Sequence, residues 1–457
     1  MEPSSMSRFL FLFLILSFNL VGNSVEAKNT SNADYQAIVD KFIPKDGPGV
    51  SVIMSQNGKV IFQGAQGMAN IEHQVPLTTD SVFRLGSITK QFTTAAIMML
   101  QEQGKLSIND DMKKYVPDFP TEGNMITIEN LMTHTSGIAN YTNDRELFTK
   151  EIQVPITLDD MLKRFEAHPM TFKTGDEMRY SNTGYVLLGK IIEVASGQSY
   201  AEFIEQNIFK KLGMNSSRYG GEQIIPNRAS GYESDHDEVV NASHIDMSWP
   251  HAAGSLLSTV GDLKIWNEAL QNGTLISKSS YQKMIKPFEL NNGEFSDYGY
   301  GFGLGKLNKY DTIEHGGGIP GFITWAVYIP SEDLYVAALT NSGNGNPGVV
   351  ARSLIAEYLE IDVPKFKPAK IDHSKAKTLL GTYKIDEKSS RTLLMEDGKY
   401  YTERETGAKF EVIPYAQNGF YYEGGLSYIE FTKNSDGQQV MNFYFNLNLE
   451  PQKAIKK

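Results

Sequence analysis

Hydrophobic and polar residues alternate in two widely separated parts of the chain. Residues 49–64 alternate on both sides of Asn57-Gly58, a dipeptide that adopts the positive φ angles of a tight hairpin turn. This pattern predicts two paired strands. Residues 323–339 alternate in the same way around Pro330-Ser331-Glu332-Asp333 and predict two further long strands.

Helical spacing dominates between these two regions. From about residue 87 to 103 the apolar residues recur at helical intervals, which places Ile97, Met98 and Leu100 on a buried face. Residues 185–194 predict a second apolar helix that ends at Gly197. Because strands stand at both ends and helices between them, we predict an α+β fold. It would contain one antiparallel sheet flanked by helices, with a largely helical subdomain inserted.

The composition of the chain changes near residue 363. Residues 363–375 are rich in proline and lysine, which is typical of a linker, and we assign the linker itself to 366–375 after a main domain over 28–365. Residues 376–457 then alternate in short runs separated by Asp397-Gly398, Asn418-Gly419 and Asp436-Gly437. Three hairpin signals in so short a segment predict a separate all-β domain, either a sandwich or a barrel.

Composition excludes several classes of function. The 457 residues carry a net charge of −11 without any basic block, so nucleic acid is not an expected partner. The absence of cysteine rules out disulfides, thiolate catalysis and cysteine-ligated metals. The eight histidines show no tight ligand spacing, so we expect neither a metal site nor any other cofactor.

Residues 1–27 have the layout of a signal peptide. Arg8 precedes an apolar run over 9–21, and Val25-Glu26-Ala27 offers small residues for cleavage. The run is shorter than the roughly 18 apolar residues of a spanning helix, although a retained anchor is the alternative. We therefore expect an exported bacterial protein, periplasmic or secreted, with no stable membrane insertion after cleavage.

The first candidate for catalysis is Ser87-Ile88-Thr89-Lys90. Residues three apart lie on one face of a helix, so the hydroxyl of Ser87 can meet the amine of Lys90. A serine becomes a strong nucleophile when a neighbour takes its proton, and a buried lysine with a lowered pKa can do so. Ser87 would stand in the first helical turn, where backbone N–H groups favour negative charge. Alone, the pattern also fits an ordinary helix start.

Two further motifs add to this candidate. Tyr180-Ser181-Asn182 precedes the second apolar helix, so its tyrosine can relay protons and its asparagine can hold a substrate amide. The segment from His315 through Gly316, Gly317 and Gly318 precedes a strand, where glycines permit close approach of backbone to a ligand. Alone, these motifs also fit a capped loop and a flexible turn.

Together, and in this order, the three motifs resemble the family of class C β-lactamases, DD-peptidases and related esterases. The stretches LMTHTSGI, LGMNSS, AAGSLLSTVGDL and HGGGIPGF strengthen the resemblance, which covers about residues 35–360. It implies that Ser87 forms an acyl-enzyme, that Lys90 and Tyr180 share proton transfer, and that the N–H groups of Ser87 and Gly318 form the oxyanion hole.

The resemblance also implies substrate binding by Asn182, His315 and Gly317. His134 and Ser136 in the His-Thr-Ser-Gly stretch match family landmarks, and for them we expect a structural role. The same expectation holds for two residues farther along, His251 and Asp262.

The third motif departs from the penicillin-binding pattern, in which a lysine provides a fixed positive charge for a carboxylate. His315 has an ordinary pKa of about 6.5 and is mostly neutral at pH 7. We therefore predict a serine hydrolase acting on a small ester or peptide-like amide, with weak β-lactam hydrolysis at most. The alternatives are a D-Ala-D-Ala carboxypeptidase, a true β-lactamase, and a catalytically silent binding or regulatory protein on the same fold.

Overall fold

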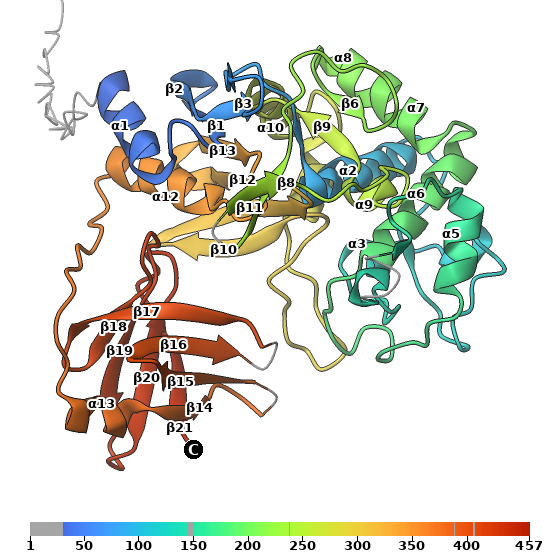
Figure 1. Cartoon of the computed structure of the whole chain (residues 1–457). Coiled ribbons are helices and arrows are strands. Elements are labelled where there is room, and N and C mark those ends of the chain that lie inside the picture. Colours follow the sequence, from blue (N-terminus) through green and yellow to red (C-terminus); the bar gives the residue numbers. More distant parts are fainter. Residues whose placement is uncertain (1–30, 145–149, 237, 388, 405–406) are drawn as a thin grey trace, which may run out of the picture.

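A computed structural model of the protein describes residues 31–144, 150–236, 238–387, 389–404 and 407–457. The predicted signal peptide lies outside the described residues. Figure 1 shows a mixed helical and sheet domain joined by an extended segment to a C-terminal domain made of strands. None of the helices in the part of the chain described is long and apolar enough to span a bilayer.

The main domain is built on one antiparallel sheet of six strands. From edge to edge its strands are β10 (Gly303–Leu307), β11 (Tyr310–Ile319), β12 (Phe322–Ile329), β13 (Leu334–Thr340), β1 (Val50–Gln56) and β2 (Lys59–Gln66). The hairpin predicted at Asn57-Gly58 is confirmed, because β1 pairs with β2 on either side of it. Strand β13 pairs with β1, so the two predicted strand regions, which are far apart in the sequence, form one antiparallel sheet.

Helices cover both faces of this sheet. Helices α1 (Asn32–Phe42) and α12 (Pro347–Tyr358) lie on one face, and α10 (Val260–Asn272) lies on the other. Every residue of β13 is buried. Its side chains alternate between the two apolar clusters: Val336 and Ala338 belong to the cluster with α12, whereas Ala337 and Leu339 belong to the cluster with α10. A strand buried on both faces is therefore almost continuously apolar.

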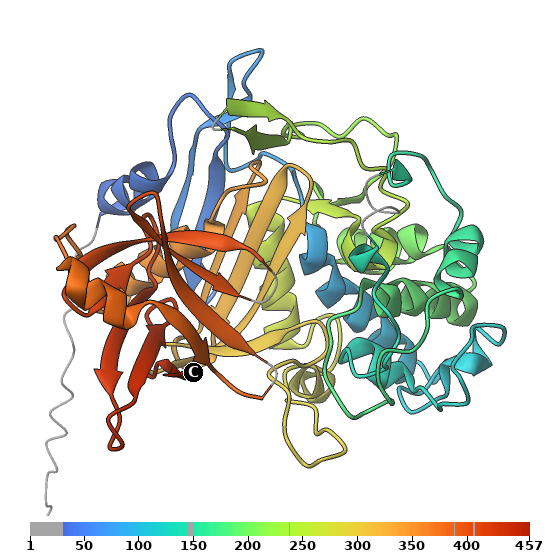
Figure 2. The ribbon, with the colours of Figure 1, turned by 60° about the horizontal axis from the view of Figure 1, so that its bottom comes forward.

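The helical part lies between β2 and β10 in the chain and beside the sheet in space (Figure 2). Its central helix, α2 (Thr89–Glu102), follows a 3-10 turn over Gly86–Ile88. Every residue from Ile88 to Leu100 is buried, so the helix is enclosed on all sides rather than on the single face predicted. Phe92 stacks on Trp266 of α10 with ring centroids 4.0 Å apart. This contact packs α2 against α10, the helix that covers one face of the sheet.

Shorter elements complete this domain. The helices are α3 (Ile128–Met132), α5 (Leu158–Phe165), α6 (Asn182–Ser196), α7 (Tyr200–Ile204), a π-helical turn (Glu205–Phe209), α8 (Lys210–Leu212), α9 (His251–Gly254) and α11 (Lys278–Met284), with 3-10 turns at Met112–Lys114, Tyr141–Asn143 and Pro330–Glu332. The small strands are β3 (Met68–Asn70), β4 (Val75–Pro76), β5 (Phe83–Arg84), β6 (Arg218–Tyr219), β7 (Tyr232–Asp235), β8 (Glu238–Asn241) and β9 (Leu256–Ser258).

The C-terminal domain is a closed barrel, which decides between the two architectures that the sequence left open. Its strands, in chain order, are β14 (Gly381–Lys384), β15 (Ser390–Glu396), β16 (Lys399–Arg404), β17 (Lys409–Ala416), β18 (Gly419–Tyr421), β19 (Tyr428–Lys433), β20 (Gln439–Tyr444) and β21 (Gln452–Lys456). Pairing of β14 with β21 closes the ring.

The segment between the domains differs from the predicted linker over 366–375, since helix α13 (His373–Leu379) occupies its last residues. The barrel has its own apolar core. However, its Leu426 and Leu447 join the cluster around α12. The barrel therefore packs on the side of the sheet that α1 and α12 cover.

Replacing Phe420 by alanine should destabilise the barrel. Its ring is fully buried in the barrel core, next to Tyr400 and Phe431. Removing a buried phenylalanine ring costs about 3–5 kcal/mol. We expect the free energy of unfolding of the barrel to fall by that amount in urea titrations followed by far-UV circular dichroism. Leu449→Ala, at an exposed position, is the matched control and should change stability by less than about 0.5 kcal/mol. Equal effects of both variants would contradict this packing.

Candidate active site

Ser87 lies where the sheet meets the helical part of the domain. It stands in the 3-10 turn before α2, at a cleft of about 200 Å³ that is also lined by Asn182, Ala253 and Gly318. Gly86 enters this turn with φ +54°, a left-handed conformation that favours glycine. The turn is therefore sharp enough to place Ser87 at the cleft while Ile88 and α2 continue into the core.

Lys90 holds the centre of the polar network. Its amine nitrogen Nζ lies 3.2 Å from Ser87 Oγ, 2.7 Å from Asn182 Oδ1 and 2.8 Å from the carbonyl oxygen of Ala253. A protonated amine would donate to all three oxygens. A neutral amine keeps two donors for Asn182 and Ala253, the shorter contacts, and its lone pair then faces the hydroxyl of Ser87. The geometry therefore suits a base that removes the proton of Ser87.

Burial explains how Lys90 can be neutral. The side chain is fully buried, and no carboxylate among the described residues forms an ion pair with it. An isolated ammonium loses its hydration in such a place, so desolvation lowers the pKa of Lys90 well below its ordinary value. The rings of Tyr180 and Tyr185 lie 4.7 and 5.2 Å from its nitrogen and contribute to its enclosure.

Tyr180 differs from Lys90 in its readiness to lose a proton. Its side chain is partly exposed, but the surrounding protein desolvates the phenol and raises its pKa, and a hydrogen bond with Ser87 only partly opposes this rise. The neutral phenol is therefore the resting form. The ring of His134 packs against it at a tilt of 37°, with 4.2 Å between centroids, and the backbone N–H of Ser181 donates to His134 Nδ1 over 3.1 Å.

Asn182 is the first residue of helix α6, whose start is capped by Ser181. The Asn182 amide nitrogen donates to Thr142 Oγ1 over 3.2 Å, while its oxygen accepts from Lys90. Its own backbone N–H donates to Asn140 Oδ1 over 3.0 Å. The side chain is thus held at the wall of the cleft, with one amide hydrogen left for a ligand.

Two glycines let strand β11 approach the nucleophile. A β-carbon on Gly317 would lie 1.9 Å from the carbonyl oxygen of Leu85 and 3.0 Å from the backbone nitrogen of Ser87, and one on Gly86 would lie 2.9 Å from the nitrogen of Gly318. Thr324 on β12 fastens the contact by donating to the Leu85 carbonyl over 2.7 Å. The N–H groups of Ser87 and Gly318 are consequently near neighbours at the cleft, as an oxyanion hole requires.

His315, which we expect to contact substrate, is not among the described residues that line the Ser87 cleft. It is buried, its Nδ1 donates to the Gly316 carbonyl over 2.5 Å, and its Nε2 accepts from the hydroxyl of Tyr298 over 2.8 Å. Burial lowers the pKa of His315 to about 4, so at neutral pH the ring is neutral and its Nε2 can accept from Tyr298. Tyr298, which no sequence motif marked, is the residue that holds it.

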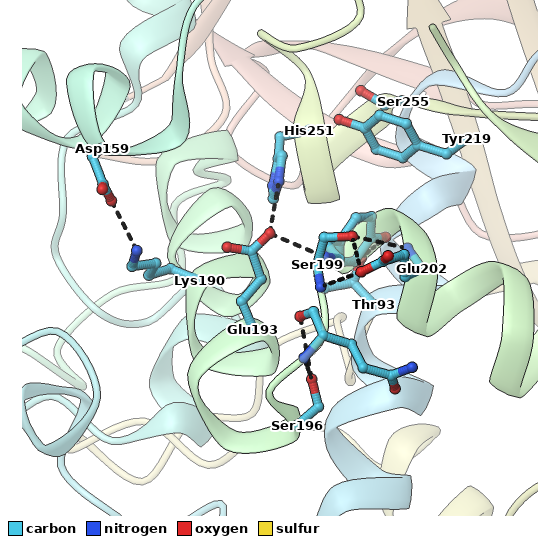
Figure 3. A network of polar contacts seen from close by, with 12 residues as sticks. Thr93, Asp159, Lys190, Glu193, Ser196, Ser199, Glu202, Tyr219, His251 and Ser255 are labelled. Carbon is cyan, nitrogen blue, oxygen red and sulfur yellow. Dashed lines mark hydrogen bonds and ion pairs between the residues drawn. The ribbon is translucent and has the colours of Figure 1, made fainter. Parts of the chain in front are cut away.

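The other histidine and aspartate landmarks have contacts that suit structural roles. His251 packs beside Gly189 of α6, and its Nε2 lies 4.0 Å from Glu193, within the polar network drawn in Figure 3. Asp262 accepts from the backbone of Ser216 and the hydroxyl of Ser217, over 3.0 and 2.8 Å.

Ser136 is buried, and its hydroxyl accepts from the backbone of Ile138 over 3.3 Å. Among the described residues no cluster of three or more histidines, aspartates and glutamates is arranged to hold a metal ion.

Sequence reasoning did not find several residues that complete the site. The Ala253 carbonyl, Thr142 and Tyr298 make direct contacts with motif residues, and Thr324 contacts Leu85 beside Ser87. Only Ala253 lay in a stretch that had been singled out, and nothing in that stretch indicated that its carbonyl would bind Lys90. A backbone acceptor leaves no signal in the residue type.

The fold, and a site in which Lys90 contacts Ser87 from one helical turn away, are those of the serine hydrolase class. The chain matches the model of the beta-lactamase family over residues 36–360, which is more than half of its length, and it belongs to that family. The predicted recognition, fold class and enzyme class are thereby confirmed.

Individual relatives agree with this assignment. The chain is 29% identical over 418 residues to Penicillin-binding protein 4* of Bacillus subtilis (strain 168), covering 86% of this chain and 92% of the relative. The octameric penicillin-binding protein homologue from Pyrococcus abyssi matches with a TM-score of 0.66 and 27% identity, covering 93% of this chain and 99% of its own. A D-stereospecific amidohydrolase from Streptomyces sp. matches with a TM-score of 0.62 and 26% identity, covering 72% and 98%.

Removing the amine of Lys90 should abolish most of the acylation. We expect Lys90→Met to lower the rate at which Ser87 is acylated by a p-nitrophenyl ester about 10²–10⁴-fold, the usual contribution of a general base. In the unmodified protein kcat/KM should rise with pH as Lys90 loses its proton, with a midpoint well below the ordinary lysine pKa. Lys190→Met, which removes an amine bound to Asp159, is the control and should keep both rate and profile. An unchanged pH profile in Lys90→Met would contradict the assignment.

Adding one methyl group at Gly317 should separate β11 from the nucleophile. The new carbon cannot fit 1.9 Å from the Leu85 carbonyl, so strand and turn must move apart and misplace the oxyanion hole. We expect Gly317→Ala to lower kcat about 10²–10³-fold. Gly184→Ala is the control, because its β-carbon would lie no nearer than 3.6 Å to any neighbour, and its activity should be unchanged. Stopped-flow acylation of both variants decides the matter, and equal rates would refute the close approach.

Proposed function

We propose that the protein is an exported hydrolase that cleaves a small ester or a peptide-like amide through an acyl-Ser87 intermediate. The observation that carries this proposal is the buried amine of Lys90, which lies 3.2 Å from Ser87 Oγ and has no counter-ion among the residues described. Such an amine is a base before substrate arrives, and no other group need be ionised.

The proposed reaction has two halves. Ser87 Oγ attacks the carbonyl carbon while its proton passes to Lys90, and the carbonyl oxygen becomes an oxyanion held by the N–H groups of Ser87 and Gly318. The leaving alcohol or amine then departs with a proton that Lys90 returns, relayed by the hydroxyl of Tyr180. In the second half, water attacks the acyl carbon and gives a proton to the same base. The bond to Ser87 Oγ then breaks, the base returns the proton to this oxygen, and the acid is released.

The exposed edge of β11 supports a peptide-like substrate. Strand β10 pairs only with Tyr310–Glu314, so the following residues, His315–Ile319, pair with β12 alone. The unpaired backbone of this segment runs beside the cleft and can align an extended peptide by main-chain hydrogen bonds. That the similar Streptomyces protein is a D-stereospecific amidohydrolase also favours amide cleavage.

The charge of the cleft argues against an efficient β-lactamase. A β-lactam carries a carboxylate, which a fixed cation in the third motif would bind. Here His315 is neutral and engaged with Tyr298, and the glycines after it offer no hydroxyl. The described residues that line the cleft include no lysine or arginine. Binding of penicillin as a slowly released acyl-enzyme remains compatible with the site, as the names of the relatives suggest.

Two alternatives have different consequences. A D-Ala-D-Ala carboxypeptidase would use the same acylation steps and differ only in substrate preference. A silent binding protein would leave the serine unreactive, yet the contacts between Lys90, Ser87 and Asn182 favour an active enzyme. Export rests on the signal-peptide layout of residues 1–27, which precede the described residues.

A substrate panel tests the proposal. We expect residues 28–457 to hydrolyse p-nitrophenyl esters or a D-Ala-D-Ala peptide, and to turn over nitrocefin with kcat/KM below about 10⁵ M⁻¹s⁻¹. Ser87→Ala should lose hydrolysis and labelling by a fluorophosphonate, because the attacking oxygen is gone. Ser136→Ala, which removes another buried hydroxyl, is the control and should still be labelled.

Mass spectrometry of the acyl adduct and spectrophotometric rates provide the measurements. Labelling that survives in Ser87→Ala would refute the nucleophile. Efficient nitrocefin turnover would refute the substrate class, and a folded but unlabelled parent protein would favour the silent scaffold.

A further inference from the structure

A second and larger cavity lies between the barrel and the main domain. Its volume is about 1070 Å³, and its lining includes Trp325 and Arg352 from the main domain and Arg391, Tyr422 and Phe443 from the barrel. It shares no lining residue with the Ser87 cleft. Trp325 packs with the cluster around α12, whereas its neighbour Thr324 reaches Leu85 beside the nucleophile. The two cavities therefore lie on opposite faces of the sheet.

Arg391 is a buried cation that lines this cavity. Its side chain is buried, with the residue 7% exposed. The centre of its guanidinium lies 3.8 Å from the ring centroid of Phe443, and Nη1 donates to the hydroxyl of Tyr422 over 3.3 Å. Among the described residues no carboxylate forms an ion pair with it. A buried charge is costly when it is unpaired, and guanidinium groups are well suited to bind carboxylates with two parallel hydrogen bonds.

A second arginine increases the positive charge. Arg404 on β16 stands directly opposite Arg391 on β15 in the barrel register, and it too lines the cavity. Like charges directly opposite each other destabilise a strand pair. Burial and the nearby Arg404 lower the pKa of Arg391, a cost that a bound anion would relieve. The barrel thus maintains an unfavourable pair of cations at its mouth.

The remaining charges do not neutralise this pair. Arg352 is satisfied by Glu314, with Nη2 at 3.1 and 2.9 Å from the two carboxylate oxygens. The acidic residues of the cavity are exposed at its rim, where water and salt screen them, and they are Asp297, Glu411 and Glu423. The cavity lining also offers a donor, because the buried indole nitrogen Nε1 of Trp325 has no hydrogen-bond partner in the part of the chain that the structure describes.

We propose that this barrel mouth binds a small organic acid, a carboxylate carried on an aromatic or otherwise apolar body. Arg391 binds the carboxylate from inside the mouth and Arg404 from its rim. The apolar body lies between Trp325 and Phe443, and Trp325 Nε1 donates to a polar atom on it. A closed barrel of eight strands is wide enough to hold one small ligand, and barrel mouths are common ligand sites.

A matched pair of ligands separates charge from shape. We would titrate 4-phenylbutyrate and its neutral analogue 4-phenylbutyramide into the full-length Ser87→Ala protein, which cannot hydrolyse the amide, and follow binding by calorimetry. We expect the carboxylate to bind with Kd about 1 mM or tighter, and the amide to bind at least about tenfold more weakly. Arg391→Gln should remove this preference, because the partner of the carboxylate is lost.

Two further variants control for folding and for net charge. Arg404→Gln, at an exposed position, should reduce the preference without disturbing the barrel core, so it tests the site even if Arg391→Gln fails to fold. Lys433→Gln removes the same charge at the far end of β19 and should leave binding unchanged. Equal binding of acid and amide, no binding of the acid at millimolar concentration, or an unaltered preference in both arginine variants would each overturn the proposal.

Discussion

The catalytic centre depends on a lysine amine that the fold encloses without giving it a carboxylate. An ion pair at Lys90 would have been easier to bury, but it would have kept the amine protonated and unable to accept the proton of Ser87. The fold provides two neutral acceptors instead, the Asn182 amide and the Ala253 carbonyl, which direct the remaining lone pair toward the nucleophile. Burial thus favours the neutral amine, which is the form that the proposed reaction needs as a base.

The same centre requires three distant parts of the chain to meet within a few ångströms. The 3-10 turn and helix α2 bring Ser87 and Lys90, the start of α6 brings Asn182, and β11 brings the backbone of Gly318. The absence of side chains at Gly86 and Gly317 lets the strand and the turn touch through their backbones. Neither the sheet nor the helical part holds a complete site alone.

The barrel adds a second environment in which a buried cation lacks a partner. In the main domain the charge of Lys90 is avoided by loss of a proton. Arg391 cannot follow that course, because a guanidinium keeps its proton in proteins. Its guanidinium lies over the ring of Phe443 and donates to the hydroxyl of Tyr422. These contacts leave part of its hydrogen-bonding capacity unused. The same cost, burial of a positive charge, thus favours a neutral base at Lys90 and a bound anion at Arg391.

The sequence by itself determined the elements and the reactive residue types. Strand alternation and the Asn57-Gly58 turn predicted the first hairpin, and helical spacing placed Ser87 and Lys90 on one face, because these patterns depend on neighbours within a few residues. Only the tertiary structure decided that the last domain is a barrel, that helix α13 begins at His373, and that Tyr298 is the partner of His315. Those outcomes depend on ring closure and on contacts between remote backbone and side-chain groups, which local residue patterns do not record.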